Sequence, residues 1–183
     1  MRTAFLIPGF LLVHAFACAQ TNATNRPPSH FPKTGISCAE LEPAFRQFRQ
    51  MLATNRVSIL TMGFDDSDHA LITARVKDSS DGGVRDFTFR RVDGKWRASG
   101  EAEARPAVYP NVGITAAELE EAISQIKEGY QIGGILWMTF EGAIRIEVTT
   151  GRQNGPRAGS GHLIYFEKKD GKWKKTGEGL RAS

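Results

Sequence analysis

Apolar positions follow the same order twice along the chain: a helical period first, then runs that alternate like strands. The helical period recurs in each half, at Leu41, Ala44, Phe45, Phe48 and Leu52 and again at Leu119, Ala122, Ile123 and Ile126. Alternation with a period of two follows each helical stretch, over residues 57–64, 70–77, 134–141 and 143–150. The pattern therefore predicts two units, each a helix followed by strands.

Two short sequence matches align these units with each other. The segment GISCAELE at residues 35–42 returns as GITAAELE at 113–120, and DGKW at 93–96 returns at 170–173. Both matches have the same order and an offset of about 78 residues, which indicates a tandem duplication of one small unit.

Each predicted helix begins with a capping box and a hydrophobic staple. The N-cap residues are Ser37 and Thr115, and a glutamate follows each of them three positions later. Pro43 interrupts the first helical stretch, because proline removes one backbone donor. Either the first helix kinks at Pro43, or its regular part begins at Glu42 with Pro43 in the first turn.

The Asp-Gly pairs at 93–94 and 170–171 predict tight hairpin turns, because this pair tolerates a positive φ. A two-residue turn places Trp96 on one face with Phe87 and Phe89. It places Trp173 with Ile164 and Phe166 in the second unit. We interpret each tryptophan as a core anchor, with contact to a partner as the alternative.

These elements predict an α+β fold: a tandem duplication of a helix followed by a four-stranded antiparallel meander, with the helix packed on one face of the sheet. The predicted units are residues 35–103 and 113–183, joined by a linker at 104–112. The two sheets could join into one broad eight-stranded sheet or pack as two separate lobes. Exposed strand edges favour joining.

A helix followed by an antiparallel meander with a Gly-Lys-Trp hairpin, at 94–96 and 171–173, resembles the cystatin-like and NTF2-like modules of bacterial secreted proteins. The resemblance covers residues 35–100 and 113–178. The tandem organisation also resembles that of the secreted β-lactamase inhibitor proteins, whose paired units form a concave sheet that grips an enzyme. Those proteins carry a disulfide in each unit and this chain does not, so the resemblance implies only a sheet surface used for binding.

Residues 1–19 have the pattern of a signal peptide. Arg2 precedes an apolar run over residues 4–16, and small residues follow. Cleavage after Ala19 would release a soluble protein. If residues 15–18 instead act as a lipobox, Cys18 would be lipidated and would anchor the chain to the bacterial envelope. Residues 20–34 are polar and rich in proline, and they predict a disordered tether. We therefore expect a secreted or periplasmic protein, with lipid anchoring as an alternative.

The charge composition of the chain argues against some classes of binding partner. The chain has 24 Lys+Arg against 20 Asp+Glu, a net charge of +4, with the two signs mixed throughout. That balance and the predicted export argue against a nucleic-acid binder. Contact with a membrane is expected only through lipidation of Cys18. Once Cys18 is removed or lipidated, Cys38 has no intramolecular partner, so the fold is not a disulfide scaffold.

Catalytic and metal-binding patterns are not found. His30, His69 and His162 lack metal-ligand spacing, and no nucleophile or phosphate-loop motif is present. Asp66 and His69 are close in sequence, yet no nucleophile stands beside them. The sequence assigns no catalytic residue, metal or cofactor, and we expect a protein that is not an enzyme.

Binding candidates come from the places where the two units differ. The first unit has the longer loop at residues 63–68, and the second has a glycine-rich loop at 151–161 that carries Arg152 and Arg157. Several lysines, including Lys172 and Lys174, surround Trp173 on the last hairpin. The alternatives without a binding role are that the glycine-rich loop only tolerates insertion and that the lysines only keep a strand edge solvated. The candidate binding residues are Arg152, Arg157, Trp96, Trp173, Lys172 and Lys174.

The hypothesis that follows is a non-enzymatic binding or inhibitory protein of the bacterial envelope or exterior. It would contact an unknown protein or envelope component through its sheet face and its unequal hairpin loops. One alternative is an NTF2-like small-molecule pocket between helix and sheet, with weak catalysis. Another is a structural envelope lipoprotein.

Overall fold

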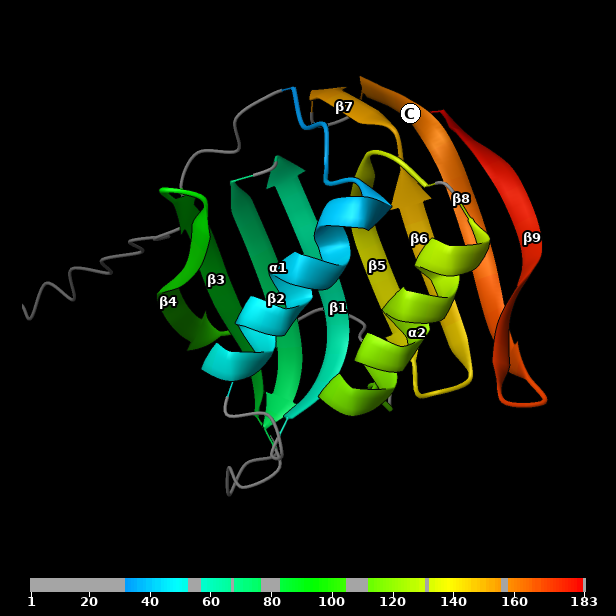
Figure 1. Cartoon of the computed structure of the whole chain (residues 1–183). Helices are drawn as coiled ribbons and strands as arrows, with labels where there is room; N and C mark the ends of the chain where they lie inside the picture. Colours follow the sequence, from blue (N-terminus) through cyan, green and yellow to red (C-terminus); the bar gives the residue numbers. More distant parts are fainter. Residues whose placement is uncertain are drawn as a thin grey trace, which may run out of the picture.

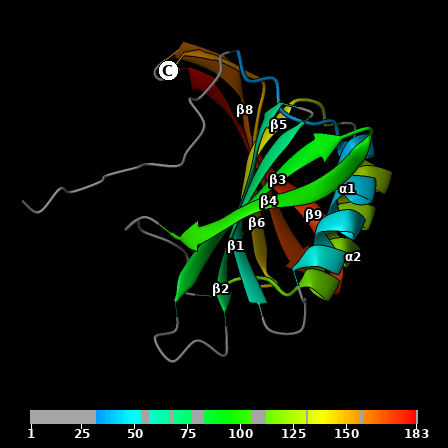
Figure 2. The ribbon, with the colours of Figure 1, turned by 90° about the vertical axis from the view of Figure 1, so that its left-hand side faces the viewer.

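The computed structural model describes residues 32–52, 57–66, 68–76, 83–104, 112–130, 132–155 and 158–182. Within these ranges the chain forms two helices and nine strands (Figure 1). All nine strands belong to one twisted antiparallel sheet, and both helices lie side by side on the same face of it (Figure 2). The expected signal peptide, Cys18 and most of the expected tether lie outside the described residues.

The helices are α1 (Cys38–Met51) and α2 (Ala116–Gly129). The strands are β1 (Val57–Asp66), β2 (His69–Val76), β3 (Val84–Val92), β4 (Lys95–Glu103), β5 (Ile135–Glu141), β6 (Arg145–Thr150), β7 (Arg152–Gly155), β8 (Ala158–Lys169) and β9 (Lys172–Ala182). Their order in the sheet is β4-β3-β2-β1-β5-β6-β8, and β8 also pairs with β7 and β9. Among the described helices, none is long and apolar enough to cross a membrane.

The predicted α+β fold class, with one four-stranded meander under its own helix in each unit, is wrong. The described residues form a β-rich fold in which nine strands share one sheet and only two helices cover it. The reason lies in the middle of the sheet, where β1 pairs with β5 at Thr61–Thr139, Met62–Met138 and Gly63–Trp137. This pairing removes two exposed edges, so neither half keeps a sheet of its own.

The residue before the N-cap of each helix also pairs with a strand from the other half of the chain. Ile36 exchanges two backbone hydrogen bonds with Ile135, at 3.0 and 2.8 Å. Ile114 does the same with Ile59, at 2.9 and 2.8 Å. Because each helix start is tied to the opposite half, the two halves form one structural unit. Residues 105–111 of the expected linker lie outside the described part of the chain.

The helix starts are confirmed. The backbone N–H of Glu40 donates to Ser37 Oγ at 3.3 Å, and that of Glu118 donates to Thr115 Oγ1 at the same distance, with reciprocal contacts completing both capping boxes. Pro43 lies inside α1, which begins at Cys38. The alternative in which the regular helix begins at Glu42 is therefore wrong.

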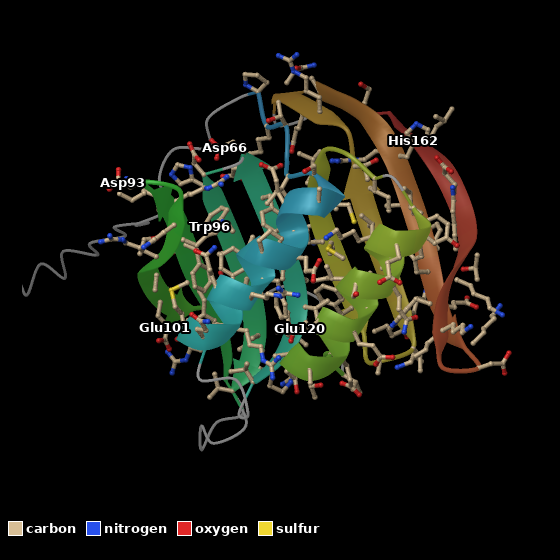
Figure 3. All side chains as sticks on the ribbon, viewed as in Figure 1. Asp66, Asp93, Trp96, Glu101, Glu120 and His162 are labelled. Carbon is tan, nitrogen blue, oxygen red and sulfur yellow. The ribbon has the colours of Figure 1, made fainter. Side chains whose placement is uncertain are left out.

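The two helices run antiparallel and are joined by reciprocal ion pairs. Lys127 Nζ on α2 lies 2.7 Å from Glu42 Oε2 on α1, and Arg49 near the end of α1 pairs with Glu120 near the start of α2. Figure 3 labels Glu120 on α2. The hydrogen bond from Lys127 is the main cause that lowers the pKa of Glu42. Each helix thus supplies one acid and one base to the other, as in a contact between two identical subunits.

One apolar cluster fills the space between the helices and the sheet. Phe48 of α1 is fully buried, and its ring centroid lies 4.6 Å from that of Phe89 and 5.0 Å from that of Trp96. The cluster continues across the sheet through Met62, Phe64, Met138, Phe140 and Phe166. Burial on this scale stabilises each large side chain by about 1.5–3 kcal/mol.

Bulges in β1 and β5 change which residues face the core. The register shifts between Ile59 and Thr61, and again between Ile135 and Trp137. Alternation alone predicts that Leu60 and Leu136 share a face with the two methionines of these strands. Both leucines are instead the extra residues of the bulges and lie outside the main cluster, which contains Ile59 and Ile135.

Candidate functional site

The face of the sheet opposite the two helices, called the open face from here on, is not covered by either described helix (Figure 2). Strand register places two rows of residues across its centre. The first row is Asp86, Thr73, Thr61, Thr139, Glu147 and Tyr165. The second row is Thr88, Leu71, Gly63, Trp137, Thr149 and Leu163.

Trp137 is the central aromatic side chain of the open face. It lies directly across from Gly63, and a Cβ added to Gly63 would overlap the Cζ3 and Cε3 atoms of the indole. The ring therefore rests on the glycine backbone, which fixes its position. Trp96 and Trp173 are only 6% and 5% exposed, whereas Trp137 is half-buried, so Trp137 is the tryptophan that presents ring surface to solvent.

The hydroxyl and carboxyl groups of the first row differ in their hydrogen bonding. Thr73 Oγ1 donates to Asp86 Oδ1 at 2.6 Å. Thr61 is buried, and its Oγ1 has no hydrogen-bond partner among the described residues. Glu147 is half-buried, and its carboxylate makes no hydrogen bond or ion pair to another described residue. The centre of the row therefore contains two polar groups without a partner among the described residues, and Thr61 Oγ1 is the buried one.

A basic side chain already stacks on an aromatic ring at one end of the first row. The guanidinium carbon of Arg145 lies 5.1 Å from the ring centroid of Tyr165. Arg145 Nη1 also lies 3.9 Å from a carboxylate oxygen of Glu141. This arrangement combines a cation–π contact with a weak ion pair, and each contributes about 0.5–1 kcal/mol at a partly exposed position.

The two halves of the chain agree in the core and differ on the open face. The pairs Met62–Ile72 in β1/β2 and Met138–Val148 in β5/β6 occupy matching positions. From this match, Thr61 corresponds to Trp137, Gly63 to Thr139 and Leu71 to Glu147. The residues that build the core are similar in both halves, whereas the centre of the open face is different in each.

Trp96 and Trp173, two of the binding candidates from the sequence, point toward the helices. Figure 3 shows Trp96 on the helix side of the sheet, beside α1. Its backbone N–H donates to Gln47 Oε1 at 2.8 Å, and the N–H of Trp173 donates to Gln125 Oε1 at 2.9 Å. Both rings belong to the core cluster, which is the anchor role that the sequence favours over contact with a partner.

The lysines of the last hairpin are partly neutralised. Lys172 and Lys174 are exposed on β9. Three neighbouring lysines are paired: Lys168 with Glu121 at 3.1 Å, Lys169 with Glu167 at 3.0 Å, and Lys175 with Glu178. The hairpin therefore carries less concentrated positive charge than its sequence suggests.

The glycine-rich segment 151–161 is not an irregular loop in its described part, because most of its residues belong to β7 and β8. Arg152 is exposed at the start of β7 and pairs across the hairpin with Ser160. Arg157 lies outside the described residues. Lys33 exchanges backbone hydrogen bonds with Gln153, and the N–H of Thr34 donates to the carbonyl of Asp65. Residues 63–66 of the expected first-unit loop belong to β1, so the expected longer loop is wrong there. The backbone contacts of Lys33 and Thr34 place the end of β1 and the β7–β8 hairpin at the same end of the sheet.

The remaining chemical candidates are occupied by local contacts. Asp66 Oδ1 accepts from the backbone N–H groups of Asp68 and His69, at 2.8 and 2.9 Å, and lies 3.2 Å from His69 Nδ1. No group of three metal-ligating side chains occurs among the described residues. Cys38 is buried, and burial raises the pKa of its thiol. A buried thiol with a raised pKa is a poor nucleophile.

No family model, curated protein or solved structure matches this chain. Trp137 and Glu147 did not enter the candidates from the sequence, although a signal for Trp137 exists. The apolar positions Met138 and Phe140 alternate toward the core, which leaves Trp137 on the opposite face, where polar residues are usual. Glu147 gives no comparable signal, because an outward-facing acid is ordinary.

Proposed function

We propose that the protein is a binding protein whose contact surface is the open face, centred on Trp137. The observation that carries the proposal is the half-buried Trp137, whose indole lies against Gly63 in the middle of the sheet. A rigid tryptophan near the centre of a surface, with tyrosine and arginine nearby, has the composition of an interface hot spot. Tyr165 and Arg145 supply these neighbours.

The opposite side of the sheet supports the same choice of surface. The described side chains between helices and sheet form the apolar cluster, in which the buried Trp173 Nε1 is a polar atom without a described partner, and this mainly apolar packing favours the open face over a small-molecule pocket. The open face instead offers an aromatic ring, several threonine hydroxyls and two carboxylates. The loop at the end of β1 and the β7–β8 hairpin flank one end of the face and extend the proposed contact.

The location of the protein remains part of the proposal. The pattern of residues 1–19 favours export from a bacterial cell, and Cys18 is the lipidation candidate. The partner is then a protein or another component of the envelope or exterior. An inhibitory protein, which covers the functional surface of its target, is one kind of such a binding protein.

The test is capture of a partner with matched variants. Immobilised wild-type protein, Trp137→Ala and Glu128→Lys are incubated with envelope and culture extracts, and circular dichroism checks that each variant is folded. Glu128 is exposed on α2, on the opposite side of the sheet. We expect a stoichiometric partner bound by wild type and Glu128→Lys and lost by Trp137→Ala. A partner lost by Glu128→Lys and kept by Trp137→Ala, or catalytic turnover without any captured partner, would overturn the proposal.

A further inference from the structure

We infer that Trp137 and Glu147 together bind an arginine side chain presented by the protein partner. This inference rests on the proposed function and names the chemistry of the central contact. It starts from Glu147, a half-buried residue whose carboxylate has no partner among the described residues. Removing part of the hydration of a carboxylate is costly unless a donor or a cation replaces the water.

Other half-buried acidic residues of the described chain do have such a partner. Glu42 binds Lys127, Glu120 binds Arg49, Asp65 binds Lys33, and Asp86 accepts from Thr73. Glu147 departs from this rule in the middle of the surface that we assign to binding. A cation from a partner would give Glu147 the same kind of contact that the other acids find within the chain.

The position of Glu147 relative to Trp137 suits a flat cation. Thr139 lies directly across from Glu147, and Trp137 is two residues away from Thr139 on the same face of β5. Diagonal neighbours of this kind lie about 7–8 Å apart, with a somewhat shorter distance between their Cβ atoms. A guanidinium group placed between them can lie over the indole and donate to the carboxylate at the same time. Its planar, weakly hydrated shape makes it a better fit than an ammonium group.

The chain contains an internal example of the same chemistry on β5, β6 and β8. Arg145 stacks on Tyr165 and lies near the carboxylate of Glu141. Trp137 and Glu147 repeat the combination of ring and acid, and no described basic side chain of this protein contacts either of them. Tryptophan is also the strongest of the aromatic side chains in cation–π contacts.

The choice of a protein partner follows from the shape and composition of the surface. The ring and the acid lie on a broad sheet face flanked by threonines, which suits a partner that covers the face and inserts one side chain at its centre. The attraction is electrostatic, so it should discriminate strongly between a charged side chain and a neutral one of the same shape.

The experiment uses the folded full-length protein and two blocked tripeptides, acetyl-Gly-Arg-Gly-amide and its citrulline analogue, which has almost the same shape without the charge. Because Trp96 and Trp173 are buried, tryptophan fluorescence reports mainly on Trp137. The titrations compare wild type with Glu147→Gln and with Glu128→Gln on the exposed surface of α2.

We expect a saturable fluorescence change with the arginine peptide that weakens as salt is raised. Binding should be about fivefold weaker or worse for the citrulline peptide and for Glu147→Gln, and unchanged for Glu128→Gln. An equal response to both peptides, an unchanged affinity in Glu147→Gln, or no response to either peptide would overturn the inference.

The capture experiment separates failure of this inference from failure of the proposed function. If capture of the partner depends on Trp137 and is unchanged in Glu147→Gln, the open face is the binding surface and the arginine contact is wrong. If capture is unchanged in both variants, the proposed function itself is wrong.

Discussion

Replacing Gly63 by alanine tests whether the glycine holds Trp137 in place. Gly63 has no positive φ, so alanine causes no backbone strain there, and a glycine in a strand costs roughly 0.5–1 kcal/mol relative to alanine. On the backbone term alone, Gly63→Ala should stabilise the protein. The added Cβ, however, would occupy the space of the Trp137 indole and force the ring to move.

The size of the opposing effect follows from the area that Trp137 buries. A tryptophan buries about 150–250 Å² in a core, so a half-buried one has roughly 100 Å² of contact at stake. At about 25 cal/mol per Å², displacement of the ring costs ~2.5 kcal/mol. Subtracting the backbone gain, we expect Gly63→Ala to destabilise the protein by about 1.5–2 kcal/mol.

The sign should reverse once the ring is removed. In a Trp137→Ala background, Gly63→Ala should stabilise by about 0.5–1 kcal/mol, giving a coupling free energy of about 2–3 kcal/mol between the two positions. Urea unfolding of the four proteins, followed by circular dichroism, measures this cycle. Gly179→Ala is the matched control, because a Cβ at Gly179 meets no atom within 4 Å. If Gly63→Ala stabilises the wild type as much as it stabilises the Trp137→Ala protein, the reasoning is refuted.

Three further predictions concern side chains around the core. Thr61→Val removes a buried hydroxyl without a partner and should stabilise by about 1 kcal/mol in thermal unfolding; a clear loss would mean that the hydroxyl is bonded in solution. Glu42→Gln should destabilise the protein by about 0.5–1 kcal/mol at pH 7. Because the folded pKa of Glu42 is lowered, the difference in unfolding free energy between wild type and Glu42→Gln should disappear as the pH falls below about 4. A difference that does not depend on pH contradicts the ion pair. In a Cys18→Ser chain, Cys38 should react with a thiol reagent only after denaturation, so fast labelling of the folded protein would show that its burial is wrong.

Features set by neighbouring residues could be predicted from the sequence. The capping boxes at Ser37 and Thr115 depend on a spacing of three residues, and both helices begin where that spacing indicates. The Asp-Gly turns also follow from local chemistry, and Asp93 and Asp170 have the positive φ values of 51° and 53° that such turns require.

Features that depend on distant pairing could not be predicted in the same way. The bulge in β1 is hidden because Ile59 and Leu60 are both apolar, so alternation cannot show which of them is the extra residue. Pairing between β1 and β5, and the bridges before the helices, join residues far apart in sequence. Exposed strand edges favour a joined sheet, yet no local pattern indicates which residues meet at the join or that the nine strands form one β-rich sheet. Alternation places Trp137 on the outward face, but its contact with Gly63 forms only across the join and could not be predicted.

The internal match between the halves limits how a partner can bind. A half-turn about the centre of the sheet exchanges Trp137 with Thr61 and Glu147 with Leu71, while the backbone and the core remain nearly equivalent. A partner that is attracted to the ring and the acid therefore meets a hydroxyl and a leucine in the rotated position. The backbone alone would accept two orientations, so the side chains at the centre of the open face must select one of them. We accordingly expect one partner molecule per chain, bound in a single orientation.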